Sequence, residues 1–199
     1  AVPALADKAR RLATLLGDTS ASRSLVAKIN DPNAPAAERL QGITAAREAK
    51  DDNGRNALLN LLRAGKADQA VLREGLRAIG TFGGDDIAYV ITDAWKNFEL
   101  PTRRAASEVL VLRSKWSRAL LAAVDQKIAQ PGDISATARR ALAQSKDATV
   151  VDHANRVLGH YRATGTDKLQ LIAEKRKLVL AAEPDLKNGH EVARRACLV

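Results

Sequence analysis

Apolar residues recur at intervals of three or four along most of the chain. Residues 5–16 carry leucines at this spacing before Gly17, and residues 25–29 carry three more apolar side chains before Pro32. Such spacing places apolar side chains on one face of a helix, whereas a strand would alternate them. Glycine and proline commonly follow the end of a helix. Residues 1–33 are therefore predicted to form a helix pair that caps one end of the fold.

From residue 34 onward the chain repeats itself. Each unit begins with an arginine, followed by small or apolar residues at the third, sixth and seventh places, although the later places fade in the last unit. The four arginines are Arg39, Arg73, Arg103 and Arg139. After a short polar break, each unit continues with a second apolar segment, at residues 56–62, 87–95, 116–128 and 150–158.

A repeat of this length, built from two helices, is typical of an α-solenoid. Neither helix of a pair can bury its apolar side alone, so stacked pairs share one core. The pattern predicts an all-α fold in which residues 34–165 form four HEAT-like helix pairs. Small residues should let neighbouring helices approach closely, at Gly42, Ala46, Gly80 and Ala106.

The polar breaks and the prolines give finer expectations. Four breaks are expected, at residues 51–54, 83–86, 114–115 and 146–147, with Asp85 and Asp86 as N-caps of the helix that follows the second break. Pro35 and Pro101 fit the first turn of a helix, where a missing N–H costs nothing.

Composition agrees with a helical fold, and charge adds a question about partners. Aromatic residues make up 3% of the 199 residues, and the formal net charge is +9. Residues 101–199 hold a net charge of +8 and residues 1–100 only +1. The simpler interpretation is that arginine and lysine keep helix faces soluble. The alternative is a surface for an acidic partner such as nucleic acid.

No catalytic or metal-binding motif stands out in the sequence. A single cysteine excludes a disulfide framework and a Cys-rich zinc site within these residues. His153 and His160 are expected on one helix face, but two turns apart, which is too far for one ion. The large aromatic residues are interpreted as packing residues, at Tyr89, Trp95, Phe98 and Trp116. We expect no enzyme activity and no metal site in this chain.

The last residues differ from the repeats. Residues 166–185 predict a charged connecting helix with Leu169, Ile172, Leu178 and Val179 as its apolar face. Residues 186–199 then contain Gly189, Val192, Ala193 and Cys197. This spacing resembles the entrance to a class I c-type cytochrome domain, in which a glycine and a short helix precede the Cys-x-x-Cys-His haem-attachment motif. The second cysteine and the histidine are absent, and an alanine replaces the usual aromatic residue.

A wider resemblance covers residues 30–199. The repeat arginines resemble those of HEAT repeats, where such an arginine bridges to acidic groups in the turns between repeats. The segments 119–124 and 127–135, ending in Asp133-Ile134-Ser135, are similar to a signature in large bacterial haem-binding dehydrogenases. In those proteins, a β-propeller that resembles pyrroloquinoline-quinone sugar dehydrogenases is followed by HEAT-like repeats and a small cytochrome c.

This resemblance implies a non-catalytic scaffold that spaces a dehydrogenase domain from a c-type cytochrome. It implies Cys197 as a candidate first haem-attachment cysteine, haem c in a domain that follows, and a periplasmic or otherwise extracytoplasmic location. Partners would be other domains of the same polypeptide and proteins on the solenoid face. The alternatives are a generic protein-binding HEAT solenoid and, less in keeping with the scarce aromatics, a basic HEAT-like nucleic-acid-binding protein.

The ends of the sequence give one more expectation. The chain contains no methionine, and residues 186–199 carry only half of the haem motif. We therefore expect the sequence to be a piece of a longer protein, with residues 186–199 as the truncated start of a cytochrome domain. The sequence as a whole also contains no apolar run long enough for a membrane span.

Overall fold

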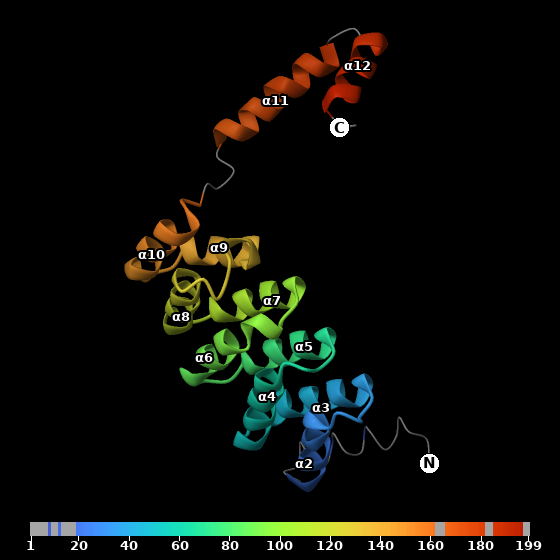
Figure 1. Cartoon of the computed structure of the whole chain (residues 1–199), viewed down its shortest axis with the longest axis vertical. Helices are drawn as coiled ribbons and strands as arrows, with labels where there is room; N and C mark the ends of the chain where they lie inside the picture. Colours follow the sequence, from blue (N-terminus) through green and yellow to red (C-terminus); the bar gives the residue numbers. More distant parts are fainter. Residues whose placement is uncertain (1–7, 9–11, 13–18, 162–165, 182–184, 197–199) are drawn as a thin grey trace. The chain divides into compact units, whose positions relative to one another are not determined.

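Every regular element that the structure describes is a helix. The structure is a computed structural model, and it describes residues 8, 12, 19–161, 166–181 and 185–196. These residues form α-helices and short 3-10 helices and contain no strand, which confirms the all-α class (Figure 1). The chain divides into two compact units, Ala1–Tyr161 and Arg162–Val199. The predicted helix at residues 5–16 lies outside the described residues, apart from Lys8 and Leu12.

The first unit contains a regular succession of helices with three 3-10 turns between them. Its elements are α2 (Thr19–Ala27), η1 (Lys28–Asn30), α3 (Ala36–Ala49), α4 (Asp52–Ala64), α5 (Gln69–Ile79), α6 (Asp86–Asp93), η2 (Trp95–Asn97), α7 (Leu100–Leu110), α8 (Ser114–Asp125), η3 (Pro131–Asp133), α9 (Ala136–Ala143) and α10 (Ala148–Leu158). The four predicted second segments correspond to α4, to α6 with η2, to α8 and to α10.

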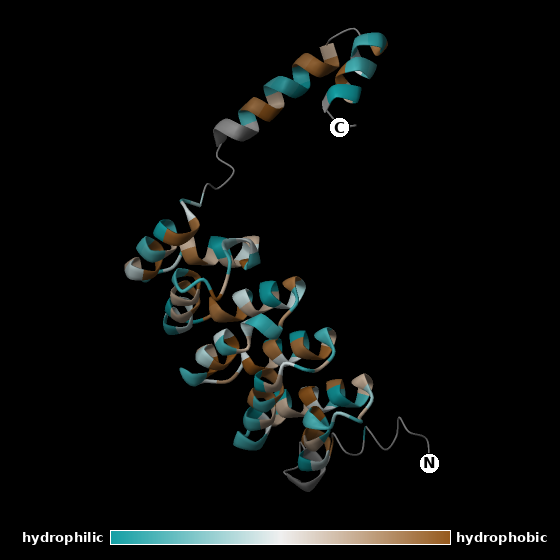
Figure 2. Cartoon of the chain, in the orientation of Figure 1, coloured by the Kyte–Doolittle hydropathy of each residue, from teal (hydrophilic) through white to brown (hydrophobic). Residues whose placement is uncertain are grey.

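Helices α3 to α10 pack in two rows. Helices α3, α5, α7 and α9 contact one another in that order and are called the first row. Helices α4, α6, α8 and α10 do the same and are called the second row. Helix α2 packs against α3 and α4. Figure 2 shows hydrophobic and hydrophilic stretches alternating along these helices, as expected when each helix buries only one side.

The core runs between the two rows and contains the largest side chains of the chain. Trp95 and Trp116 are 0% exposed and Phe98 is also buried, which confirms their interpretation as packing residues. Tyr89 is 63% exposed, so the same interpretation is wrong for this residue. It lies on the outer side of α6, where the helical period turns it away from buried Ala88 and Val90.

Small residues bring neighbouring helices close together, as the sequence predicts. A Cβ atom on Gly42 would lie 2.5 Å from the carbonyl oxygen of Leu25 and 2.9 Å from Cγ1 of Ile29. A Cβ atom on Gly80 would lie 3.2 Å from Cγ1 of Val109. The first distance is shorter than any normal contact, so α2 and η1 can approach α3 only because residue 42 has no side chain.

The helix ends depart from the predictions in several places. Helix α4 begins at Asp52, so the expected break at residues 51–54 is wrong except at its first residue. Helix α8 begins at Ser114, so the expected break at residues 114–115 is wrong and the chain turns at 111–113 instead. Asp85 occupies the N-cap position of α6, but its side chain forms no cap hydrogen bond. Pro101 lies in the first turn of α7, as predicted, whereas Pro35 is the N-cap residue of α3 and precedes the helix.

The second unit consists of α11 (Thr166–Ala181) and α12 (Leu186–Ala196). All residues at positions 170–181 and 185–195 are exposed. A helix turns by about 100° per residue, so Ile172 and Leu178 lie roughly 120° apart around α11. The expectation of a single apolar face on α11 is therefore wrong for the side chains that the structure describes; that of Leu169 lies outside them.

Candidate functional site

Three of the four repeat arginines bond the 3-10 turn that precedes their own helix. Nε of Arg39 donates to the carbonyl oxygen of Ile29 in η1 at 2.9 Å. Nε of Arg103 donates to the carbonyl oxygen of Trp95 in η2 at 3.3 Å. Arg139 donates in the same way to a carbonyl oxygen of η3 at 2.7 Å. A charged donor satisfies an acceptor in a turn that has few backbone partners of its own.

Arg73 is not the equivalent of the other three arginines. It forms no hydrogen bond or ion pair with another described residue, and no 3-10 turn precedes α5. Helix α5 buries Gly75 where α7 buries Ala106, which places Leu72 at the position of Arg103. Leu72 is 0% exposed. The predicted role of Arg73 as a repeat arginine is therefore wrong.

The sequence did contain a signal for this register. Gly75 follows Leu72 by three residues, as Gly42 follows Arg39. A Cβ atom on Gly75 would lie 2.8 Å from Cδ2 of Leu61, so this glycine marks the same kind of close approach as Gly42. The position of the glycine indicates which face of α5 is buried, whereas the position of the arginine at 73 does not.

Among the described residues, Arg103 is the one repeat arginine that reaches an acid, so the expectation that these arginines bridge to acidic groups holds for this residue alone. Nη1 of Arg103 lies 3.5 Å from Oδ1 of Asp133, a buried carboxylate. The other oxygen of Asp133 accepts hydrogen bonds from the indole N–H of Trp95 at 3.1 Å and from the backbone N–H of Gln130 at 3.0 Å. Burial raises the pKa of Asp133, but these two hydrogen bonds and the charge of Arg103 outweigh it and lower the pKa below its usual value.

Each residue of the segment Asp133-Ile134-Ser135 has a structural role. Ile134 is buried in the core. The hydroxyl of Ser135 accepts a hydrogen bond from the N–H of Ala138 and so caps α9. The N–H of Ser135 donates to Oγ of Ser107 in α7 at 3.1 Å. This segment therefore fixes α9 against α7, and packing alone is enough to explain its residues.

In the second row, most basic side chains are paired with acids of the adjacent helix or its N-cap. The pairs are Arg55–Asp86, Lys115–Asp85 and Arg118–Asp147. The acids lie at the start of the neighbouring helix, where the helix dipole favours negative charge. The hydrogen bond from Thr149 and the one from Arg118 lower the pKa of Asp147, and the hydrogen bond to Asp85 raises the pKa of Lys115.

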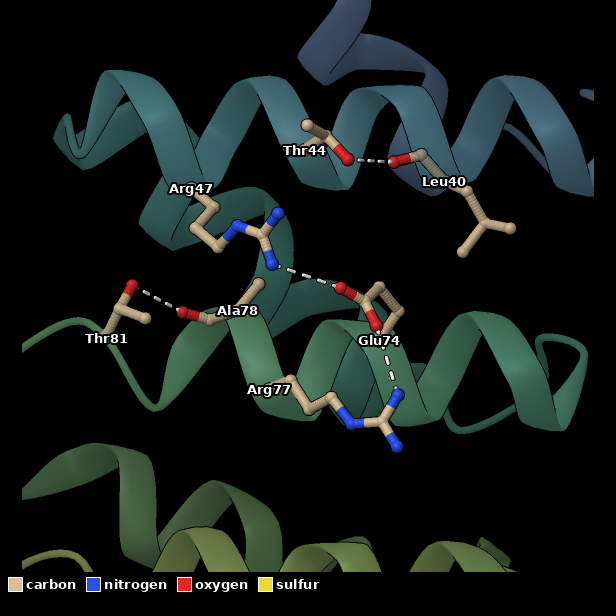
Figure 3. Close-up of polar contacts among 7 residues, drawn as sticks. All are labelled: Leu40, Thr44, Arg47, Glu74, Arg77, Ala78 and Thr81. Atoms are coloured by element: carbon tan, nitrogen blue, oxygen red, sulfur yellow. Dashed lines mark hydrogen bonds and ion pairs between the residues drawn. The ribbon is translucent and has the colours of Figure 1, made fainter.

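The first row has an excess of arginine. Its four helices contain eight arginines, no lysine and four glutamates, whereas the four helices of the second row contain five basic and five acidic residues. Figure 3 shows where one glutamate is used: Glu74 accepts hydrogen bonds from Arg47 and from Arg77, both at 3.2 Å. This network joins α3 to α5, whereas the side chains of Arg73 and Arg104 form no hydrogen bond or ion pair with another described residue.

A groove of about 480 Å³ lies on the outer side of the second row. Its polar walls are Asp85, Tyr89, Lys115 and Arg118, and its floor is made of alanines from α6 and α8. Both cations in the groove already bond acids, Asp85 and Asp147. The groove therefore presents little uncompensated charge to a ligand.

The candidate haem-attachment residue, Cys197, lies outside the described residues. Helix α12 ends at Ala196, immediately before it. Gly189 lies inside α12, whereas the cytochrome entrance would place the glycine ahead of the helix. Val192 and Ala193 lie on the same helix and are exposed.

The histidines are not arranged for metal binding in the described part of the chain. Helix α10 ends at Leu158, so His160 lies beyond it and the expectation that His153 and His160 share a helix face is wrong. Nε2 of His153 lies 2.6 Å from Oδ2 of Asp125, which links α10 to α8. No group of three or more His, Cys, Asp or Glu side chains among the described residues could hold a metal ion.

Comparison with known proteins adds no family to these observations. No protein-family model, no curated protein and no solved structure matches the chain. Among the residues that the structure describes, no helix combines the length and the apolar character that crossing a bilayer requires.

Proposed function

We propose that this chain is a non-catalytic helical-repeat scaffold, an α-solenoid of HEAT-like helix pairs. The observation that carries the proposal is a set of polar contacts between residues that are one repeat apart. The contacts join Asn30 to Ala57, Ser135 to Ser107, Arg103 to Asp133, Arg118 to Asp147 and Trp116 to Gly84, at separations of 27 to 32 residues. Contacts that all span about one repeat length are expected when each unit packs only on its neighbours.

The scaffold is proposed to space a catalytic domain from a c-type cytochrome in an extracytoplasmic electron-transfer protein. Two features support this part of the proposal: the resemblance of residues 30–199 to haem-binding dehydrogenases, and the helix that ends directly before Cys197. A rigid spacer would fix the distance between the two redox centres. If the haem is absent, the same repeat array would act as a generic protein-binding solenoid.

The haem part of the proposal can be tested on the natural gene. The reading frame, with whatever residues it encodes after Val199, is expressed together with the machinery that attaches haem c. The proposal predicts covalent haem and a sharp α-band in the reduced spectrum. In Cys197→Ala the α-band should shift or disappear, because a thioether is lost, whereas Gly189→Ala should keep it. A reading frame without Cys-His after Val199, or a chain without covalent haem, would contradict the proposed link to a cytochrome. The generic protein-binding scaffold would then be the remaining function.

A further inference from the structure

Three arginines occupy equivalent positions on successive helices of the first row. Arg104 and Arg140 directly follow the repeat arginines of α7 and α9, and Arg73 directly follows Leu72, which takes the same place in α5. Helix α5 contacts α7, and α7 contacts α9. Equivalent positions on packed helices lie side by side, so Arg73, Arg104 and Arg140 form one line across the row, called here the arginine stripe.

The packing of the protein does not account for the arginine stripe. Arg73 and Arg104 form no hydrogen bond or ion pair through their guanidinium groups with another described residue. Arg140 donates to the hydroxyl of Tyr161 at 3.1 Å, which is a neutral acceptor. The cations Arg55, Lys115 and Arg118 of the second row instead pair with acids in a neighbouring repeat. Arg104 and Arg140 are exposed and Arg73 is half-buried, so the stripe holds charge that another molecule can reach.

The spacing of the stripe restricts what that molecule can be. Packed helices lie about 8–10 Å apart, so neighbouring arginines of the stripe are separated by roughly that distance. An α-helix rises 1.5 Å per residue, which places side chains seven residues apart on one face at a spacing of about 10.5 Å. A guanidinium group binds a carboxylate through two parallel N–H donors. A helix with an acidic residue at every seventh position could therefore pair with all three arginines.

The surroundings of the stripe favour a protein helix over a nucleic acid. The four helices of the first row contain no aromatic residue, and among the described residues Tyr161 alone bonds a stripe arginine, so the stripe offers no series of platforms on which successive bases could stack. Leu100 lies one turn before Arg104 on the same side of α7 and is 44% exposed. Glu108 lies one turn after Arg104 and would repel a continuous line of phosphates. An amphipathic helix can accommodate both neighbours, with an apolar residue against Leu100 and a basic residue against Glu108.

We infer that the first row is a docking surface for an acidic amphipathic helix of a partner protein, held by Arg73, Arg104 and Arg140. The inference rests on the proposed scaffold function and specifies the kind of partner that the scaffold binds. It does not depend on the haem, because the arginine stripe lies wholly within α5, α7 and α9. The two proposals can therefore fail separately: a haem protein that binds no acidic helix would contradict only this one.

The test is a fluorescence anisotropy titration of the whole chain at low salt with three labelled probes. The first probe is a helical alanine- and glutamine-rich peptide with three glutamates seven residues apart. The second probe is the same peptide with the three glutamates adjacent to one another, and the third is a single-stranded oligonucleotide. The spaced peptide should bind roughly tenfold more tightly than the clustered one, because only its carboxylates match the stripe.

Matched charge removals complete the test. Arg73→Gln/Arg104→Gln/Arg140→Gln should weaken binding of the spaced peptide roughly tenfold. Arg63→Gln/Lys96→Gln/Arg156→Gln removes three exposed cations from α4, η2 and α10 and should change it less than about twofold. If the triple stripe variant loses its helical circular dichroism, Arg104→Glu alone provides the same comparison.

Three results would overturn the inference. The first is equal affinity for the spaced and the clustered peptide, which would indicate unspecific attraction to a basic chain. The second is equal loss of binding in the stripe variant and the control variant. The third is tighter binding of the oligonucleotide than of the spaced peptide, lost in the stripe variant, which would assign the stripe to nucleic acid.

Discussion

The two rows of helices are built on the same repeat but use their charged residues differently. In the second row, Arg55, Lys115 and Arg118 each pair with an acid of the adjacent helix or its N-cap. In the first row, Gly80 at the end of α5 allows close approach to Val109 of α7, and Arg73 and Arg104 pair with no acid among the described residues.

This difference between the rows distinguishes two kinds of basic side chain. Those of the first kind lie in the second row and pair with acids of a neighbouring helix, whereas Arg73 and Arg104 of the first row can bind another molecule. A basic side chain near the start of the adjacent helix can pair with an acid there, as Arg55, Lys115 and Arg118 do in the second row. In the first row, Arg47 pairs with Glu74 and joins α3 to α5, but Arg73 and Arg104 form no contact of this kind with another described residue. Net charge alone could not have shown this, because the balance of arginine and acid differs between two faces of one unit.

The largest expected effect concerns the packing that both rows share. Trp95 is 0% exposed, and its indole N–H donates to Asp133. Trp95→Ala should lower the free energy of unfolding by about 3–5 kcal/mol, because it leaves a cavity and removes one of the two hydrogen bonds to Oδ2 of Asp133. Urea denaturation followed by circular dichroism measures this. Tyr89→Ala, an exposed aromatic of the same row, should stay within about 0.5 kcal/mol of the unsubstituted chain; equal losses would contradict the assignment of the core.

The buried carboxylate of Asp133 should make stability depend on pH. Its pKa is lowered in the folded protein, so its contribution is present above the unfolded value of about 3.9 and is lost as the pH falls through the folded value. Asp133→Asn should cost roughly 1.5–3 kcal/mol at neutral pH. Urea titrations at neutral pH and in steps below about pH 4 should show a smaller decline for the variant than for the unsubstituted chain.

A parallel decline would show that Asp133 is not responsible for the pH dependence. Asp93→Asn, which removes an exposed acid of α6, serves as the control and should leave the unfolding free energy at neutral pH unchanged.

The close approach of α2 and η1 to α3 should be sensitive to a single methyl group. Gly42→Ala forces a Cβ atom to within 2.5 Å of a backbone oxygen and should cost about 1–3 kcal/mol in urea denaturation. Gly189 in α12 has no neighbour within 4 Å of an added Cβ. Gly189→Ala should therefore not destabilise the protein, because alanine favours a helix. A neutral Gly42→Ala would mean that α2 and η1 do not pack against α3 as described.

The register of the repeat arginines can be tested by a matched pair. Arg103→Ala removes hydrogen bonds to η2 and to Asp133 and should cost about 1–3 kcal/mol. Arg73→Ala removes a side chain that has no partner among the described residues and should cost less than about 0.5 kcal/mol. Thermal unfolding of both variants under one buffer condition measures the difference. If both cost the same, Arg73 belongs to the repeat after all.

The smallest effect is expected for the exposed pair of the second row. Lys115 and Asp85 are both largely exposed, and such pairs gain little because solvent and salt screen them. Lys115→Gln should leave the urea midpoint unchanged at moderate salt. A clear shift in the midpoint would show that the three ion pairs of the second row stabilise the fold cooperatively.

Much of the fold could be predicted because helical spacing of apolar residues is a strong local signal. The paired helices and the buried tryptophans followed from it. The prediction that Arg73 is a repeat arginine was wrong, because Leu72 takes the position of the repeat arginine in α5. Gly75, three residues after Leu72, marks the buried face of this helix. Tyr89 was misplaced because an aromatic residue beside buried neighbours can still lie on the outer face. The prediction of a single apolar face on α11 was wrong because the apolar residues are spread around the helix.

The arginine stripe was not predicted from the sequence at all. It depends on the register of α5, which the burial of Leu72 and Gly75 establishes. It also depends on which cations are already paired, and pairing is a property of neighbouring repeats that local spacing does not encode.

The central claim is that each repeat is held only by its neighbours, and hydrogen exchange in Val150→Ala tests it most directly. Val150 is fully buried in α10, at the end of the array of described repeats. The account predicts faster amide exchange in α9 and α10, with α3, α4 and α5 keeping the rates of the unsubstituted chain. An equal acceleration of the slowest amides from α3 to α10 would show a single cooperative core and contradict the repeat scaffold.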